Sequence, residues 1–171
     1  MKQTNKGVTL AFRWRYIVLP LILLLISVIL VAIFYARLPF QVAYHFQSDG
    51  SPDRWLIQPL VVIWALLPQF LLTLGAAIVT WVISGLATRF LDPESAVVKP
   101  QRTMLIMGNM VAIPQLILDF AMLDIFSYNS YQTHLRPSVL VFALIVMVIG
   151  GVILGVYFIQ TMKQVWLSNK K

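Results

Sequence analysis

Four long apolar runs, separated by short polar segments, dominate the pattern along the chain. They cover approximately residues 16–36, 58–87, 103–126 and 138–162. A helix of about 20 apolar residues can cross a bilayer, and each run reaches that length. The pattern therefore predicts an all-α integral membrane protein, a four-helix bundle that forms a single domain over residues 1–171.

The composition also indicates a membrane protein. The chain is 60% hydrophobic and 11% charged, whereas a soluble domain is typically about 45–50% apolar and about 25% charged. The absence of cysteine excludes disulfides, thiolate metal sites and thiol catalysis. These values argue against a soluble globular enzyme and against a disordered tail.

Basic residues are distributed unequally between the two sides that the runs define. Cytoplasmic segments carry the excess of Lys and Arg, so we expect both termini in the cytoplasm and loops 37–57 and 127–137 outside. The net charge of +7 is then explained by topology and lipid headgroups, and no nucleic-acid partner is expected. The predicted inner side carries Lys2, Lys6, Arg13, Arg15, Arg89, Lys99, Arg102, Lys163, Lys170 and Lys171, and the outer side Arg37, Arg54 and Arg136.

Loop 37–57 has the most distinctive sequence. Gly50 and Pro52 disfavour a long helix, and the Asp-Gly and Ser-Pro pairs here are turn signals. The sequence predicts an ordered turn, with Asp49 or Asp53 capping the next helix. A divalent metal on His45, Asp49 and Asp53 is an alternative, but their even spacing suits a helix, which the glycine and proline oppose. We therefore expect no metal and no cofactor.

The stretch LPFQVAYHFQSDGSPDRW in this loop resembles a signature of small bacterial membrane domains. The signature reads Leu-Pro, His-Phe-Asn and Gly-x-Pro-Asp-Arg-Trp, and follows a first transmembrane helix. It occurs in the amino-terminal half of SdpI-type immunity proteins of Gram-positive bacteria, and alone as a domain of unknown function. The matching residues are Leu38, Pro39, His45, Phe46, Gly50, Pro52, Asp53, Arg54 and Trp55.

The chain departs from the signature in places. Gln47 replaces the usual Asn, Ala43 replaces a second proline, and residues 56–58 replace a run that often carries a lysine. The motifs of the second half of SdpI-type proteins are absent. The resemblance therefore implies the amino-terminal domain, in a bacterial inner or plasma membrane. For SdpI itself it implies protection from a secreted peptide toxin, coupled to capture of a transcription repressor.

Polar residues inside the second and third runs form a second candidate site. Gln69 and Gln115 each follow a proline in similar short segments, and they are expected at nearly equal depth. Asp119 lies one turn beyond Gln115, within the membrane, where an ionisable group is costly and indicates function by default. Their helical spacing predicts that these side chains share an interior. Pro68 and Pro114 are expected to kink the two helices.

The fourth run contains a Gly-x-x-x-Gly pair. Gly151 and Gly155 allow another helix to approach closely, either inside the bundle or in a dimer or subunit face. Neither histidine is framed by a catalytic motif, and there is no phosphate-binding loop, so we do not expect an enzyme.

Three functions remain open. The first is a non-enzymatic SdpI-like protein whose outer loop 37–57 recognises a peptide, lipid or protein partner, while the cytoplasmic loop 88–102 docks or reports. The second is an accessory subunit that stabilises a larger membrane complex. The third is a small transporter that uses Asp119. The expected partners are membrane lipids and a membrane protein complex or a second copy.

Overall fold

The computed structural model describes residues 12–90, 100–135 and 137–168. The basic residues Lys2, Lys6, Lys99, Arg136, Lys170 and Lys171 lie outside the described residues, as does most of loop 88–102. The orientation of the chain across a membrane therefore stays a prediction.

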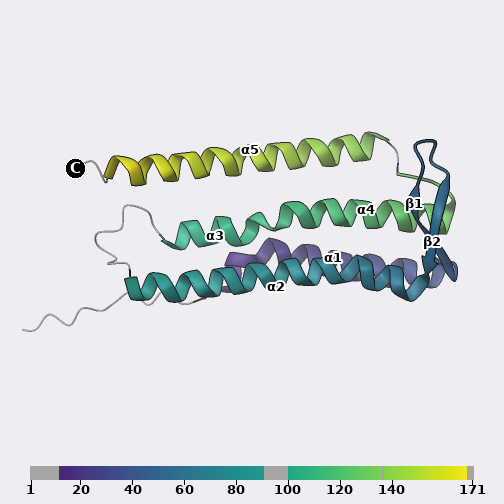
Figure 1. Cartoon of the computed structure of the whole chain (residues 1–171), viewed down its shortest axis with the longest axis horizontal. Helices are drawn as coiled ribbons and strands as arrows, with labels where there is room; N and C mark the ends of the chain where they lie inside the picture. The colour runs from purple at the N-terminus through teal and green to yellow at the C-terminus, as the bar shows by residue number, and fades with distance from the viewer. Residues whose placement is uncertain (1–11, 91–99, 136, 169–171) are drawn as a thin grey trace, which may run out of the picture.

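Helices make up most of the described chain and run alongside one another, with a small β-hairpin at one end (Figure 1). The predicted all-α bundle is confirmed, with the hairpin as an addition. The helices are α1 (Val18–Phe34), α2 (Gln58–Phe90), α3 (Pro100–Met110), α4 (Ala112–Tyr131) and α5 (Pro137–Ser168), and the short 3-10 helices η1 (Trp14–Ile17) and η2 (Tyr35–Arg37) flank α1.

Within the described residues, three helical segments are long and apolar enough to cross a membrane. They are Trp14–Arg37, Gln58–Gly85 and Met104–Tyr131. Helix α5 contributes an apolar stretch over Leu144–Ile153 in its described part. Most large apolar side chains of these helices are exposed, as expected for a protein whose surface faces lipid tails.

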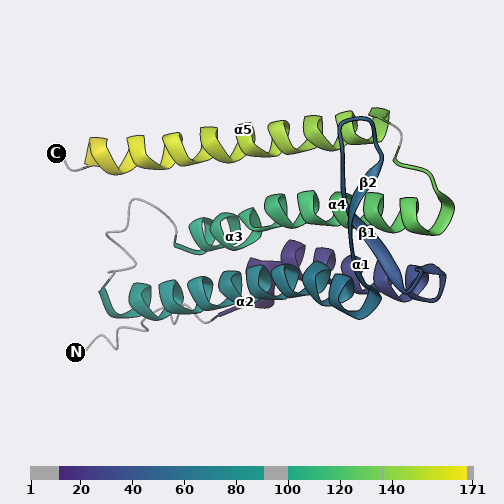
Figure 2. The same ribbon diagram turned by 45° about the vertical axis from the view of Figure 1, so that its right-hand side comes forward.

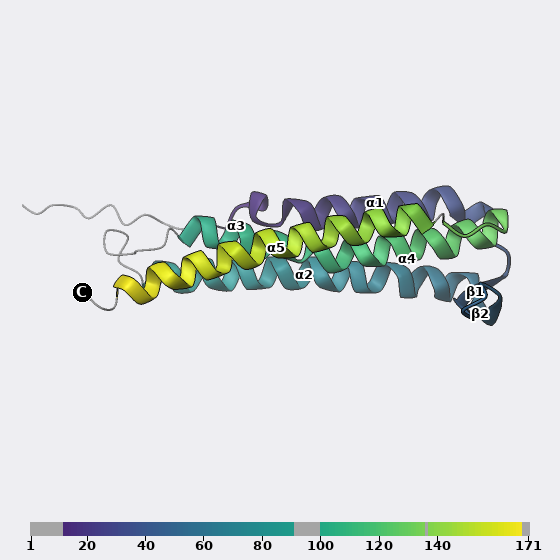
Figure 3. The same cartoon turned by 90° about the horizontal axis from the view of Figure 1, so that it is seen from above.

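Helices α1, α2 and α4 pack against one another, and α5 lies against α4 (Figures 2 and 3). An apolar cluster joins α1, α2 and α4 to the hairpin at one end of the bundle. Its buried members are Phe34, Leu38, Val42, Val61, Met122 and Phe126. Leu38 and Val42 come from the distinctive segment, so the hairpin is part of the core.

The third predicted helix is in fact two helices. Val111 separates α3 from α4, three residues before Pro114. Proline lacks an N–H group and its ring clashes with the carbonyl four residues earlier, which here belongs to Met110. Pro68 has the same chemistry, but α2 is continuous through it. Helix α4 extends to Tyr131, beyond the approximate end at residue 126 that was predicted for the third apolar run, so the following loop is shorter than residues 127–137.

Helix α3 is held closely against η1. A Cβ atom on Gly108 would lie 2.1 Å from the carbonyl oxygen of Tyr16, so only glycine permits this contact. The neighbouring Asn109 accepts a hydrogen bond from the backbone N–H of Leu19 and donates to the carbonyl of Arg15. Asn109 thereby satisfies a free backbone N–H at the start of α1.

Loop 37–57 contains an antiparallel hairpin of β1 (Gln41–Phe46) and β2 (Pro52–Ile57). The register is irregular between Ala43 and His45, so Tyr44 has no partner on β2. The sequence predicted an ordered turn here but not the strands. Side chains of α4 and of the segment after it hold the strands in place. The local sequence pattern of the hairpin does not show which distant residues these are.

The glycine pair of α5 makes no close contact within the described chain. A Cβ atom added to Gly151 or Gly155 would meet no atom within 4 Å. Packing of these glycines inside the bundle is therefore not observed. The alternative, a face for a second copy or another subunit, stays a prediction.

Candidate functional site at the hairpin end of the bundle

The tip of the hairpin is a tight turn stabilised by Asp49. Its Oδ1 accepts hydrogen bonds from the backbone N–H of Ser51 at 2.9 Å and from its hydroxyl at 2.7 Å. These bonds, the backbone one first, lower the pKa of the Asp49 carboxyl. Gly50 has a φ of 85°, in the left-handed region that favours glycine. The prediction that Asp49 or Asp53 caps the next helix was wrong, because both carboxylates are engaged within the hairpin.

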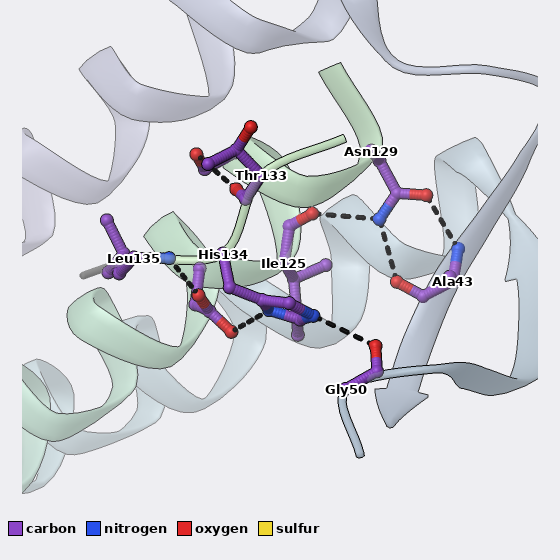
Figure 4. Close-up of polar contacts among 9 residues, drawn as sticks. Ala43, Gly50, Ile125, Asn129, Thr133, His134 and Leu135 are labelled. Atoms are coloured by element: carbon purple, nitrogen blue, oxygen red, sulfur yellow. Dashed lines mark hydrogen bonds and ion pairs between the residues drawn. The ribbon is translucent and has the colours of Figure 1, made fainter. Parts of the chain in front are cut away.

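His134, from the segment after α4, joins the turn to the end of that helix (Figure 4). Its Nε2 lies 3.1 Å from the carbonyl oxygen of Gly50, and its Nδ1 lies 3.1 Å from Oδ2 of Asp124. The other oxygen of Asp124 accepts from the backbone N–H of Leu135 at 2.7 Å. Both ring nitrogens face acceptors, so the doubly protonated imidazolium satisfies this geometry best.

The charge state of His134 follows from these neighbours. Burial lowers the pKa of His134, but the hydrogen bond to Gly50 and the hydrogen bond and negative charge of Asp124 together raise it above its ordinary value. The contact between hairpin and α4 is therefore strongest where the imidazole is protonated.

Asn129 of α4 anchors the first strand (Figure 4). Its side-chain amide accepts from the N–H of Ala43 at 2.8 Å and donates to the carbonyl of the same residue at 2.8 Å. A proline at residue 43 has no N–H group and makes only half of this pair. The alanine that stands where the signature usually has proline supplies this N–H group, as any residue other than proline would.

An aromatic cluster completes the attachment of the hairpin. The ring of Phe46 lies 4.8 Å from that of Tyr128 and 4.7 Å from that of His134, both in edge-to-face geometry. Phe46 and Gly50, two residues of the signature, therefore help to position the hairpin. At the base, the Gln58 side chain donates to the carbonyl of Tyr35.

The remaining signature residues lie on the open surface of the hairpin. His45 Nδ1 lies 2.6 Å from Oδ1 of Asp53 across the strands. Arg54 and Trp55 are exposed on β2, and Pro52 is half-buried at its start. No group of three or more metal-ligating side chains occurs in the described part of the chain. In the hairpin, the Asp49 carboxylate bonds Ser51, while His45 pairs with Asp53.

A pocket of about 520 Å³ lies beneath the hairpin, between α2 and α4. Its walls are almost entirely apolar, and Tyr44 and Trp64 are exposed at its edge. Ligand pockets typically have volumes of about 300–1,000 Å³ and apolar linings. The lining residues are Tyr44, Leu56, Val61, Trp64, Ala65, Leu118, Ala121, Met122, Ile125 and Phe126.

The polar residues predicted inside the membrane are brought together, as their spacing indicated. The side-chain amide of Gln69 donates to the carbonyl of Gln115 at 2.9 Å, and that of Gln115 donates to the carbonyl of Gln69 at 3.3 Å. Gln69 also donates to Oδ1 of Asp119 at 2.9 Å. The prediction that the three side chains share an interior is confirmed, and the two glutamines, which were expected at nearly equal depth, contact each other.

Reasoning from the sequence missed several residues that build these two regions. Ser27 donates to Asp119 from α1, and Asn129 and His134 hold the hairpin. A single serine in an apolar run carries little signal, because its hydroxyl can bond its own helix backbone. Asn129 and His134 lie far along the chain from the hairpin, and no local pattern links them to it.

Comparison with known families gives one match. Residues 22–68 match a family described as a domain of unknown function (DUF1648). The match covers most of α1, the hairpin and the first part of α2, and includes every residue of the signature. No curated protein and no solved structure is significantly similar to the chain.

Proposed function

We propose that this chain is a non-enzymatic membrane protein that binds an amphiphilic molecule at the outer surface of a bacterial cell membrane. The hairpin binds the polar head of the ligand, and the pocket beneath it holds the apolar part. The observation that carries the proposal is the apolar pocket of about 520 Å³, lined by both the hairpin and two spanning helices.

A cationic side chain on the strand that lines the pocket supports a ligand with an acidic or anionic head. Side chains alternate between the two faces of a strand, so Arg54 shares a face with Leu56, which lines the pocket. Arg54 is exposed and makes no ion pair within the described residues. An arginine with free donors beside an apolar slot is suited to a phosphate or carboxylate.

The family resemblance supports the same direction of function. The match to a domain of unknown function covers the hairpin, and the SdpI-like signature implies recognition of a secreted peptide. An amphipathic peptide and a lipid share the chemistry that the pocket accommodates. We propose the SdpI-like role on this basis, with loop 37–57 as the recognition element.

Native mass spectrometry of the purified chain tests the binding proposal. With equal amounts of phosphatidylglycerol and phosphatidylcholine, we expect preferential retention of phosphatidylglycerol. Ala121→Phe fills the pocket and Arg54→Gln removes the cation, so both should reduce this retention several-fold. Ala32→Phe is the matched control, since Ala32 is exposed on α1 outside the pocket. Equal retention of the two lipids, or equal loss in the control, would contradict the proposal.

An accessory subunit is the second candidate, and α5 favours it. Helix α5 packs chiefly against α4, and apolar residues such as Phe142 and Val148 are exposed on it beside the bare glycines Gly151 and Gly155. Purification in mild detergent followed by mass spectrometry distinguishes the candidates. A subunit brings stoichiometric partners, and these are lost when Gly151 and Gly155 are replaced by leucine.

A further inference from the structure

A second polar site lies inside the helical bundle, remote from the hairpin surface. It consists of Ser27 on α1, Gln69 and Thr73 on α2, and Gln115 and Asp119 on α4. Gln69, Gln115 and Asp119 are 1%, 0% and 6% exposed. Each lies near the middle of its membrane-spanning segment, so water from either surface is far away.

Every hydrogen-bond donor of this cluster is already engaged. The two amide hydrogens of Gln69 are directed to the carbonyl of Gln115 and to Oδ1 of Asp119. Those of Gln115 are shared among Thr73 Oγ1 and the carbonyls of Gln69 and Pro20.

The two hydroxyl groups have no hydrogen to spare either. Ser27 has one hydrogen for two acceptors, Leu23 O at 2.9 Å and Asp119 Oδ1 at 2.5 Å. The single hydroxyl hydrogen of Thr73 likewise faces the carbonyls of Gln69 and Pro20. The cluster therefore has no donor left for any further acceptor.

Three buried acceptor oxygens remain without a partner. They are Gln69 Oε1, Gln115 Oε1 and Asp119 Oδ2. Rotating either amide by 180° does not remove the deficit, because it would place the amide oxygen against carbonyl or carboxylate oxygens. Unpaired buried polar atoms are rare in native proteins, and an ion or water commonly accounts for those that occur.

The cluster also lacks a positive charge. The ion pairs of the described residues are His45–Asp53 and His134–Asp124, and Asp119 takes part in neither. A buried carboxylate without a counter-charge is strongly unfavourable in a membrane interior. Water would supply donors but no charge, and a proton on Asp119 would supply one donor for three oxygens.

We propose that this cluster binds a small monovalent cation of the Na⁺ type. The free oxygens belong to a carboxylate and two amides, with hydroxyl and carbonyl oxygens beside them, and hard cations prefer such ligands. A single positive charge neutralises Asp119, whereas a divalent ion would leave an excess charge in the membrane. The free oxygens come from α2 and α4, and Ser27 of α1 bonds the same carboxylate, so the bound ion stabilises the contact of all three helices. This site is independent of the function proposed for the hairpin.

Thermal unfolding of the purified chain in detergent tests the site directly. A ligand that binds only the folded state stabilises it in proportion to the logarithm of its concentration above the dissociation constant. We expect each tenfold increase in NaCl in that range to raise the unfolding midpoint by roughly 3–6 °C. Choline chloride at the same ionic strength should produce no such rise.

Variants assign the effect to the cluster. Asp119→Asn should abolish the Na⁺ dependence, while Asp49→Asn, which alters an exposed carboxylate of the hairpin turn, should retain it. If Asp119→Asn does not fold, the comparison of NaCl with choline chloride on the unmodified chain still decides. Equal midpoints in the two salts would overturn the proposal, and so would a Na⁺ dependence that persists unchanged in Asp119→Asn.

Discussion

The two polar regions of this protein differ in how their hydrogen-bond donors and acceptors are matched. One attaches the hairpin to α4, and the other joins α1, α2 and α4. At the hairpin end, Asp124 and Gly50 each place an oxygen against a ring nitrogen of His134, and Asn129 pairs with the backbone of Ala43. Inside the bundle, the cluster around Asp119 uses every donor and still leaves three acceptors unpaired. The polar groups that the residues at the hairpin end direct at one another are therefore paired, whereas the buried cluster leaves oxygens free for the cation that we propose.

Whether a polar network is fully paired indicates if it positions its elements or is itself a candidate site. A paired network positions its elements, and the binding surface that we propose lies next to it, on the exposed face of the hairpin and in the pocket below. An unsatisfied buried network is itself a candidate site. The signature residues divide in the same way, since Phe46 and Gly50 contact the residues that hold the hairpin, while Arg54 and Trp55 are exposed on its surface.

The strongest test of the comparison is removal of a donor from the buried cluster. Gln69→Leu takes away the amide that serves both Asp119 and the carbonyl of Gln115. Hydrogen bonds to charged groups contribute about 1.5–3 kcal/mol, so we expect the free energy of unfolding to fall by about 2–3 kcal/mol. Reversible unfolding in mixed micelles, followed by circular dichroism, measures the change. Gln160→Leu, at an exposed position on α5, is the matched control and should change little.

Removal of the hairpin anchor should have a smaller and more local effect. Asn129→Leu leaves both backbone groups of Ala43 unpaired and should destabilise the hairpin by about 1–2 kcal/mol. Hydrogen exchange measured by mass spectrometry should then rise in residues 41–57 and stay unchanged in the middle of α1. Asn129→Asp keeps the acceptor and loses the donor, so an intermediate rise is expected. Unchanged exchange in Asn129→Leu would show that the aromatic contacts alone hold the strand.

The turn itself provides a third test. Gly50→Ala forces a side chain into the left-handed region, which costs about 1–2 kcal/mol for an L-residue. We expect faster hydrogen exchange at the hairpin tip and weaker contact with His134, while helix content stays constant. Gly85→Ala is a matched control in regular helix, where alanine is favoured. If the tip is unaffected, the turn conformation is not the constraint that the structure indicates.

The smallest expected effect is the pH dependence of the hairpin contact. The pKa of His134 is raised in the folded state, so its stabilising contribution is fully present below the unfolded value of about 6.5 and is lost as pH rises through the higher folded value. The groups that face the ring are Asp124, the Gly50 carbonyl, Phe46 and Tyr128.

Two measurements check this dependence. An NMR titration of the His134 ring should give a midpoint above 6.5, and hairpin hydrogen exchange, corrected for its intrinsic pH dependence, should increase through that range. His134→Gln should remove the pH-dependent part of the exchange. A His134 midpoint below 6.5 would contradict the expected sign.

The sequence predicted the membrane class and the inner polar cluster from local pattern alone. Apolar runs of the right length must be helices in a membrane, since only helices and closed barrels satisfy their backbone groups there. Helical spacing then placed Gln69, Gln115 and Asp119 on inward faces, and their shared depth followed from counting residues. These inferences need only the period of the helix and the thickness of a bilayer.

Only the tertiary structure showed the hairpin, the break before α4 and the contacts of the signature residues. The strands are held by Asn129 and His134, more than 80 residues from their partners Ala43 and Gly50, and no pattern within one segment encodes that contact. Two prolines in similar segments also have different outcomes, since the helix is interrupted before Pro114 and continues through Pro68. Spacing along one chain segment determines which face a side chain occupies, but contacts between segments determine what it meets there.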